Sequence, residues 1–375
     1  MAFYMQQNLI PGAVVQIQQN GKTWLRKAYG FAQVKDFEGN FIPNPPETDF
    51  NILYDLASLT KVVGTTTAIM LLHDRGKLNV EDPVWKFIPG FKTPDKESIT
   101  IRHLLTHTSG IAEWYPMFYF CKNRKEVFSL IEQLPLKYPV GAARHYSDLG
   151  FTILGEIIEK VAGLPMEQFM KEQVFMPLGM KHTGYLPDKN QKFAATSMGN
   201  PYEYRMVHEP ALGFTVEGLD PDSWNGWRQY VLIGEVNDGN AWYASQGVSG
   251  AAGIFSTIDD VQRLVNLLMN KGKVKKKPFI SSKTIDLFLT QDQYLNGLGW
   301  MMDPDNSFMK NGPAGTFGHT GFTGTSISVV PKKKLSIIIL INRQNEGLQA
   351  NGTYFNPNPI RRGIFEFALE ALEAK

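Results

Sequence analysis

The sequence has little cysteine: Cys121 is the only one among 375 residues. One cysteine cannot form an intramolecular disulfide, and it leaves no Cys/His cluster of the kind that binds structural zinc. It lies in an aromatic stretch at 114–120, so we expect a small buried apolar residue rather than a nucleophile.

The sequence also lacks long apolar runs and a large excess of charge of either sign. No stretch of 18 apolar residues occurs, which excludes a membrane-spanning helix. The first seven residues lack a basic region followed by an apolar run, so we expect a cytoplasmic location for the chain as given, or an extracytoplasmic one if an export signal has been removed. The 38 basic and 36 acidic residues give a net charge of +2, which offers no reason to expect a nucleic acid or an anionic membrane as partner.

Strand-forming sequence lies at both ends of the chain. Asn20 and Gly21 separate two alternating segments and predict a hairpin. Near the C-terminus, a β-branched run at 335–341 is typical of a central strand buried on both faces. The strands expected are 13–18, 23–29, 324–330 and 335–341, and an amphipathic helix is expected at 359–374.

Helical periodicity dominates the middle of the chain, at 100–106, 124–134, 149–162, 166–174 and 259–269. The compact solution is an α/β (α+β) fold: an antiparallel sheet from both termini, flanked by helices, with an inserted and mostly helical lobe. We expect a single domain over 1–375, with residues 1–80 and 255–375 in the α/β lobe and 81–254 in the helical lobe.

Ser58 is the candidate nucleophile. Ser58 and Lys61 begin a helical run that stops near Gly76, so both are expected on one face of its first turn. The free N–H groups of a helix start stabilise a developing oxyanion, and burial of Lys61 would depress its pKa and make it a general base. A second Ser-x-x-Lys, from Ser307 to Lys310, lies in turn-forming sequence without a following helix and is rejected.

Two further motifs accompany Ser58. Tyr146-Ser-Asp148 precedes a helix, where Ser147 or Asp148 can also act as an N-cap. The second motif, His319-Thr320-Gly321, enters the first C-terminal strand, where glycine lets an edge strand and a substrate backbone approach closely. The other Tyr-x-Asn triplets, at Tyr294 and Tyr354, lie too near or beyond the last motif.

In order and spacing, these three motifs resemble the class C β-lactamase and penicillin-binding serine hydrolase family, and the segment 234–240 is similar to a penicillin-binding-protein-4B-like subgroup. The resemblance covers nearly the whole chain and implies a β-lactamase/transpeptidase-like fold without metal or cofactor. It implies that Ser58 forms an acyl-enzyme and that Lys61 and Tyr146 share its proton. It further implies an oxyanion hole formed by the backbone N–H groups of Ser58 and Phe322, and substrate binding by Asp148, His319, Thr320 and Gly321.

The pKa of the Tyr146 phenol must fall by about 3 units for the side chain to act as a base at neutral pH. Lys61 and His319 are the expected sources of the positive potential that lowers it.

Two positions depart from the family pattern. The family often has Asn where this chain has Asp148, and a carboxylate can only accept hydrogen bonds unless it is protonated. Asp148 can instead pair with Lys61 and keep it charged, which would move the base role to Tyr146. Many β-lactamases have Lys in place of His319, and histidine is fully charged only below about pH 6.5, so weak β-lactam turnover is expected.

The sequence therefore predicts a serine hydrolase that acts on D-amino-acid-terminated peptides or amides, or on small esters. The alternatives are a class C-like β-lactamase and a non-catalytic penicillin- or peptidoglycan-binding sensor. His103 and His107 have the i, i+4 spacing of a metal site but lack the accompanying glutamate, so structural roles are expected for both. Ser249 lacks the second glycine of a nucleophile elbow, which argues against an α/β-hydrolase.

Overall fold

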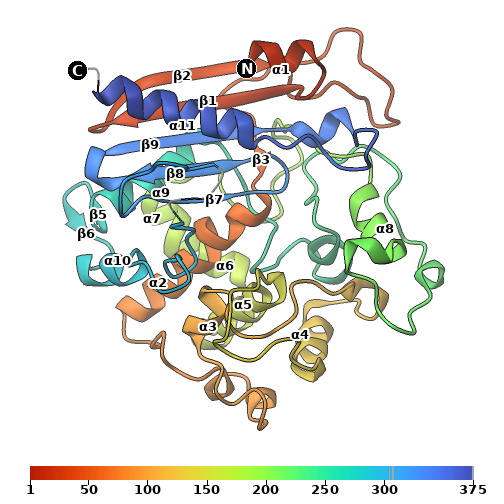
Figure 1. Cartoon of the computed structure of the whole chain (residues 1–375), viewed down its shortest axis with the longest axis vertical. Helices are drawn as coiled ribbons and strands as arrows, with labels where there is room; N and C mark the ends of the chain where they lie inside the picture. The colour runs from red at the N-terminus through yellow and green to blue at the C-terminus, as the bar shows by residue number, and fades with distance from the viewer. Residues whose placement is uncertain (304, 306–307, 374–375) are drawn as a thin grey trace.

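A five-stranded antiparallel sheet forms the centre of the computed structural model, which describes residues 1–303, 305 and 308–373. The strand order is β2-β1-β9-β8-β7, so the two ends of the chain meet in one sheet (Figure 1). The strands are β1 (Gly12–Gln19), β2 (Lys22–Gly30), β7 (Phe317–Thr320), β8 (Ser326–Val330) and β9 (Leu335–Ile341). This confirms the predicted α+β class and the sheet built from both termini.

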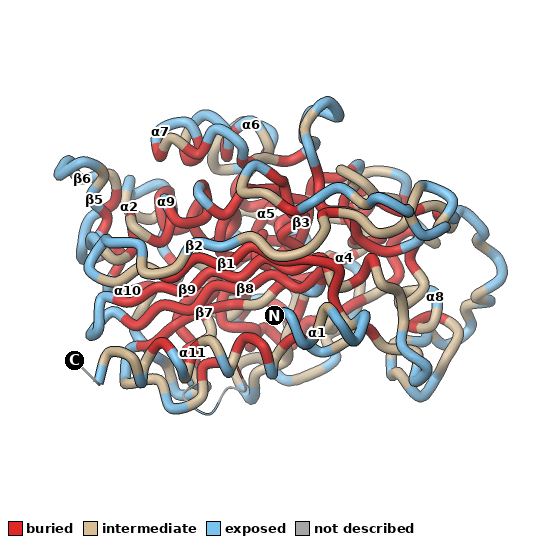
Figure 2. Tube along the Cα trace, turned by 90° about the horizontal axis from the view of Figure 1, so that it is seen from above, coloured by how far each residue is buried: buried red, intermediate tan, exposed pale blue. Residues whose placement is uncertain are grey.

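The central strands bury both faces, and their alternating side chains enter two different cores. Val15 of β1 and Ile339 of β9 pack with Phe365 of α11 (Asn358–Glu373). Val14 and Ile338, each one residue away, join the larger core beneath the opposite face. Figure 2 shows the buried strands between α11 on one side and α9 (Ile258–Met269) with α2 (Thr67–Asp74) on the other. The run of β-branched residues in β9 is therefore explained by burial on both sides.

The first hairpin turns where the sequence predicts it. Asn20 and Gly21 have φ values of 52° and 71°, the left-handed conformation that a two-residue hairpin turn requires. The pairing of Gln19 with Lys22 closes the hairpin.

The predicted helices of the middle segment are all present. They are α3 (Ile101–Leu105), α4 (Arg124–Gln133), α5 (Asp148–Ala162), α6 (Met166–Met170) and α9, and α6 continues as a π-helix at Lys171–Phe175. The start of α5 is fixed because the Ser147 hydroxyl accepts a hydrogen bond from the Gly150 N–H at 3.0 Å. The helix ends at Ala162, and the next residue, Gly163, has a φ of 68°, the left-handed conformation that commonly follows a helix.

Short elements complete the fold: α1 (Ala2–Gln6), β3 (Tyr54–Asp55), α7 (Met176–Leu178), α8 (Pro201–His208), β4 (Phe255–Ser256), β5 (Lys273–Val274), β6 (Lys277–Pro278) and α10 (Ser282–Phe288). Cys121 is buried, as expected, and burial raises the pKa of its thiol to about 11. Within the described residues, no helix has the length and apolar character needed to cross a bilayer. Ser307 and Ala374 lie outside the described residues. The lobe boundaries at 80/81 and 254/255 stay a prediction.

Candidate active site

Ser58 lies in a sharp connection between β3 and the helix that carries Lys61. It belongs to a 3-10 turn, Ala57–Leu59, which leads into a π-helix at Lys61–Thr66 and then into α2. Ala57 has a φ of 46°, a left-handed conformation that costs a non-glycine residue roughly 1–2 kcal/mol. Between Ile52 and Leu72, Ser58 is the one residue that is not buried. The sequence predicts an ordinary first α-helical turn here, whereas the structure has a strained turn that presents the hydroxyl.

The Lys61 ammonium is fully buried, and three acceptors surround it. It donates to the Ser58 hydroxyl oxygen at 2.9 Å and to the Ala251 carbonyl at 3.0 Å, and it lies 2.7 Å from an Asp148 carboxylate oxygen. An ammonium group can only donate hydrogen bonds, and these oxygens hold it beside the Ser58 hydroxyl.

Of the two expectations for Lys61, this arrangement favours the ion pair with Asp148 that keeps the lysine charged. Burial alone would lower the pKa of Lys61, but the Asp148 carboxylate and the Tyr146 phenol raise that pKa above its ordinary value. Lys61 is therefore an ammonium ion in the resting site, not the neutral base that its burial suggested.

Tyr146 lies at the N-terminal side of α5, and its hydroxyl is hydrogen-bonded to Ser58 and Lys61. Its ring centroid is 4.4 Å from that of His107, whose Nδ1 accepts a hydrogen bond from the Ser147 N–H at 3.0 Å. Burial raises the pKa of Tyr146, although Lys61 opposes the change. The expectation that neighbouring charges lower the pKa of Tyr146 overall is therefore wrong.

His319 does not supply the positive charge that was expected of it. It is 1% exposed on β7, and its Nδ1 lies 2.8 Å from the Thr320 carbonyl oxygen. Burial lowers the pKa of His319 to about 3, and the nearby Lys61 charge acts in the same direction. The imidazole is thus neutral at physiological pH.

Phe322 lies in the turn between β7 and β8, against the Ser58 segment. The Gly324 N–H closes this turn on the Gly321 carbonyl at 3.1 Å, which leaves the Phe322 N–H outside the closing hydrogen bond. A Cβ on Gly321 would lie 2.4 Å from the Leu56 carbonyl oxygen, so glycine is required for this close approach.

Two threonines join this turn to the segment before Ser58. The Thr323 hydroxyl donates to the Asp55 carbonyl at 2.7 Å, and the Thr325 hydroxyl donates to the Leu56 carbonyl at 3.0 Å. The two predicted oxyanion-hole residues are therefore carried by segments that are bonded to each other.

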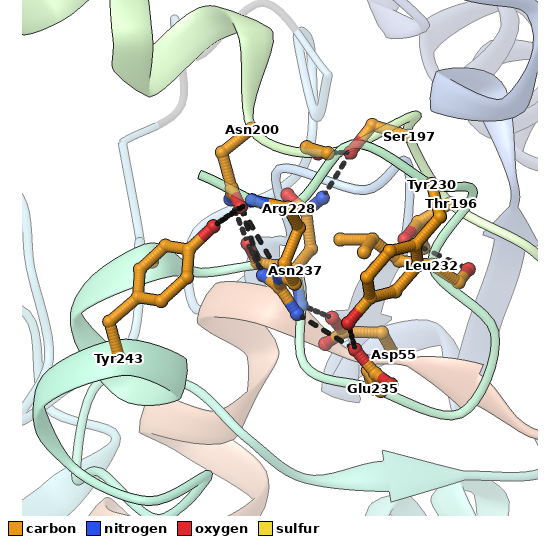
Figure 3. A network of polar contacts seen from close by, with 12 residues as sticks. Asp55, Thr196, Ser197, Asn200, Arg228, Tyr230, Leu232, Glu235, Asn237 and Tyr243 are labelled. Atoms are coloured by element: carbon orange, nitrogen blue, oxygen red, sulfur yellow. Dashed lines mark hydrogen bonds and ion pairs between the residues drawn. The ribbon is translucent and has the colours of Figure 1, made fainter. Parts of the chain in front are cut away.

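Asn237, in the 234–240 segment, belongs to a polar network that reaches Asp55 (Figure 3). The Asn237 N–H donates to one Asp55 carboxylate oxygen at 2.6 Å, while the other oxygen accepts from the Ala57 N–H at 2.8 Å. Arg228 donates to the Asn237 carbonyl at 3.1 Å and to the side chain of Asn200. Asp55 thus links this network to the strained residue before Ser58.

A pocket of about 380 Å³ opens over Ser58. Its walls come from the three motif regions and from the end of the chain: Ser58, Tyr146, Met301, Phe308, Thr320, Gly321, Phe322, Arg343, Asn356, Pro357, Asn358 and Arg361. Lys61 and His319 lie buried beneath it. Asp148, at the start of α5, pairs with Lys61 and is not among the described lining residues, so its predicted contact with substrate stays a prediction.

Arg343 and Arg361 were missed by the sequence analysis, because neither belongs to a recognisable motif. Arg343 lies two residues after the end of β9 and Arg361 lies in α11. The one available signal was a cation at the end of a buried strand, which by itself does not distinguish a site residue from a solvated one.

The two histidines of the 103–107 pair have structural partners. The His103 Nδ1 accepts from the Thr100 N–H at 3.1 Å as part of the cap of α3, and His107 supports Ser147. No group of three or more His, Cys, Asp or Glu residues in the described part of the chain is arranged to hold a metal ion.

Comparison with known proteins identifies the family of the chain. The family model described as beta-lactamase matches residues 2–355. N-acetylmuramyl-L-alanine amidase of Bacillus subtilis (strain 168) is 31% identical over 390 residues, which cover 96% of this chain and 84% of the relative. A Salmonella typhi protein provisionally named D-alanyl-D-alanine carboxypeptidase is 31% identical over 368 residues, covering 92% and 81%.

A solved structure of similar fold is the class C beta lactamase from Rhodobacter sphaeroides, with a TM-score of 0.69. Its sequence is 18% identical and the match covers 99% of this chain and 97% of that one, which supports the fold alone. The family model and the 31% identical relatives both span most of the chain. The protein is a serine hydrolase that belongs to the β-lactamase family.

Proposed function

We propose that the protein cleaves peptides or amides that end in a D-amino acid, or small esters, through an acyl-enzyme on Ser58, with weak or no turnover of β-lactams. The observation that carries this proposal is the hydrogen-bonded cluster of Ser58, Lys61 and Tyr146 at the floor of the pocket. Ser58 and Tyr146 are 88 residues apart in the sequence, yet the Tyr146 hydroxyl is hydrogen-bonded to both Ser58 and Lys61.

The donors in this cluster define a path for the proton. Because Lys61 donates to the Ser58 oxygen, the hydroxyl hydrogen of Ser58 is free to point elsewhere, and the Tyr146 oxygen is its hydrogen-bond partner. As the Ser58 oxygen attacks the substrate carbonyl carbon, the phenolate form of Tyr146 takes the hydroxyl proton and becomes a neutral phenol. Burial disfavours that phenolate, and the Lys61 ammonium opposes the effect of burial. This assigns the general base role to Tyr146 and an electrostatic role to Lys61.

The remaining steps follow from the same groups. The N–H groups of Ser58 and Phe322 stabilise the oxyanion of the tetrahedral intermediate. When the intermediate collapses, the C–N or C–O bond breaks and Tyr146 returns its proton to the leaving amine or alcohol. Water then attacks the acyl-enzyme and gives a proton to the Tyr146 phenolate. When this second intermediate breaks its bond to Ser58 and releases the acid, Tyr146 passes that proton to the Ser58 oxygen, which regenerates the hydroxyl.

The charge of the pocket supports the substrate class. Arg343 and Arg361 contribute two guanidinium groups, and no Asp or Glu is found among the described lining residues, which suits a substrate that carries a carboxylate. The relatives from Bacillus subtilis and Salmonella typhi carry the names amidase and carboxypeptidase. On β7, the neutral His319 offers no cation to a β-lactam carboxylate, which supports weak β-lactam turnover.

The test is a substrate panel of a D-alanyl-D-alanine peptide, nitrocefin and short-chain nitrophenyl esters. We expect wild type to hydrolyse the peptide or the esters faster than nitrocefin, and Ser58→Ala to abolish all turnover. Ser129→Ala, on the exposed surface of α4, is the matched control and should retain it. We expect Tyr146→Phe to lower kcat by about 10²–10⁴-fold.

A fluorophosphonate probe gives an independent readout. It should label wild type and Ser129→Ala but not Ser58→Ala. If wild type is neither labelled nor active on any substrate of the panel, the pocket belongs to a non-catalytic binding protein. If nitrocefin is the fastest substrate, the proposed substrate class is wrong.

A further inference from the structure

Two arginines contact the backbone of the turn that carries Phe322, the proposed oxyanion donor. We call residues 321–325, between β7 and β8, the oxyanion turn. Arg343 and Arg361 come from separate elements, a 3-10 helix after β9 (Arg343–Glu346) and the helix α11, and both reach carbonyl oxygens of this turn.

Arg343 holds the Phe322 carbonyl with a forked contact. Its Nη2 and Nε donate to that oxygen at 2.6 and 3.0 Å, and its Nη1 donates to the Phe355 carbonyl at 2.5 Å. The guanidinium carbon also lies 5.2 Å from the centroid of the Phe322 ring. Within the described residues, no carboxylate lies within ion-pair distance of Arg343, so its donors serve the backbone of two neighbouring loops.

Arg361 acts on the other side of the same turn. It is 6% exposed, and its Nη2 lies 2.9 Å from the Thr325 carbonyl oxygen and 3.4 Å from that of Gly321. The Gly321 carbonyl and the Phe322 N–H belong to one peptide group. A charged donor on that carbonyl polarises the peptide and strengthens its N–H as a hydrogen-bond donor.

Burying two cations without a carboxylate partner is costly unless their donors are satisfied. Burial lowers the pKa of Arg343 to about 10 and that of Arg361 to about 9, so both stay charged at neutral pH. Arg361 also donates to the Asn358 side chain and Arg343 to the Phe355 carbonyl, and both arginines contact carbonyl oxygens of the oxyanion turn rather than an acidic side chain.

We propose that Arg343 and Arg361 are positioning residues for the Phe322 N–H that faces the oxyanion: Arg361 polarises the peptide that carries this N–H, and Arg343 holds the next peptide of the turn. The proposal rests on the acyl-enzyme function proposed above. In this role the arginines act through the backbone: they hold the Phe322 N–H where it stabilises the oxyanion. The effect on the transition state is therefore the same for charged and neutral substrates.

The competing role is direct binding of a substrate carboxylate, and Arg343→Lys separates the two. Lysine keeps the charge but cannot form the fork to Phe322 while also reaching Phe355. Positioning predicts that Arg343→Lys lowers kcat for a neutral nitrophenyl ester by about tenfold or more, with KM changed less than about twofold. Carboxylate binding predicts an unchanged neutral ester and a raised KM for the D-alanyl-D-alanine peptide alone.

Arg362→Gln is the matched control, because Arg362 follows Arg361 in α11 but pairs with Glu366 at 2.7 Å. It should leave both substrates within about twofold of wild type. Arg361→Lys tests the second arginine with the same two substrates, and its expected loss is again in kcat for the neutral ester.

A measurement that does not need turnover keeps the two proposals distinguishable. Hydrogen–deuterium exchange of peptides spanning 317–325 should accelerate in Arg343→Lys relative to wild type and Arg362→Gln at equal thermal stability. If exchange of this segment and kcat for the neutral ester both match wild type, the positioning role is overturned. If wild type itself hydrolyses nothing, the proposed function fails, and the exchange result alone decides whether Arg343 holds the turn.

Discussion

The Lys61 ammonium lies 2.7 Å from the Asp148 carboxylate, inside a site where Lys61 has no exposed surface. Burial by itself favours the neutral amine, and this ion pair reverses that preference. The residue that departs from the commoner Asn of the family pattern therefore favours the charged form of the lysine, in line with the proposed base role of Tyr146.

Asp148→Asn should move the alkaline limb of the pH–rate profile to lower pH. Asp148 raises the pKa of Lys61, so its removal leaves burial as the main influence, and burial lowers that pKa. We expect a shift of about one pH unit or more in kcat/KM for a neutral ester. Asp188→Asn, at an exposed position, is the control. An unchanged alkaline limb would show that Asp148 does not govern the charge of Lys61.

His319 should remain neutral across the working range of the enzyme. Its pKa is lowered to about 3 by burial and by the Lys61 charge, so the imidazole ring is uncharged between pH 5 and 8. Imidazole NMR shifts should be flat for His319 over that range. The exposed ring of His182 offers an internal comparison in the same spectra. A titration of His319 with a midpoint near 6.5 contradicts the account of the buried site.

Asp55→Ala should destabilise the protein and impair catalysis together. The carboxylate accepts from the Ala57 and Asn237 N–H groups, and its loss leaves two buried donors unpaired at about 1–3 kcal/mol each. Urea unfolding measures the loss of stability, and ester hydrolysis measures the loss of Ser58 geometry. Asp188→Ala removes a similar local contact, to the Asn190 N–H, at an exposed turn and should cost much less. Equal effects of the two substitutions would deny Asp55 its proposed role.

Glu203→Gln should flatten the dependence of stability on pH. Burial, assisted by the nearby Asp238 charge, raises the pKa of Glu203 to about 8. A carboxyl whose folded pKa exceeds its unfolded value contributes stability below about pH 4.5, and this contribution is lost as the pH rises towards 8. Urea unfolding at pH 5.5 and pH 8 should therefore differ less for Glu203→Gln than for wild type. Glu209→Gln, on the exposed surface beyond α8, should keep the wild-type difference, and an unaltered slope in Glu203→Gln refutes the assignment.

The fold could be predicted wherever local patterns and burial agree. The Asn20-Gly21 turn and the β-branched run of β9 each fix a strand pairing, because turn geometry and two-sided burial leave few alternatives. The π-helix after Ser58 and the short strand β7 carry no such pattern. Their hydrogen-bond register depends on contacts with distant segments, such as the bridge between Gly318 and Met301.

The chemistry of the candidate site could be predicted only in part. Ser58, Lys61 and Tyr146 meet as their motifs suggest, but the direction of the Lys61 pKa depends on whether Asp148 comes within ion-pair distance. Sequence spacing leaves that distance open. Arg343 and Arg361 could not be recognised, since their donors serve backbone carbonyls that no side-chain motif encodes.

The central claim is that Ser58 carries the acyl group, and intact-protein mass spectrometry tests it most directly. Wild type mixed with an activated ester or a penicillin and quenched in acid should gain the mass of one acyl group on the peptide containing Ser58. The same adduct should form far more slowly in Tyr146→Phe and not at all in Ser58→Ala. An acyl group found on another residue, or an adduct that persists in Ser58→Ala, would contradict the account.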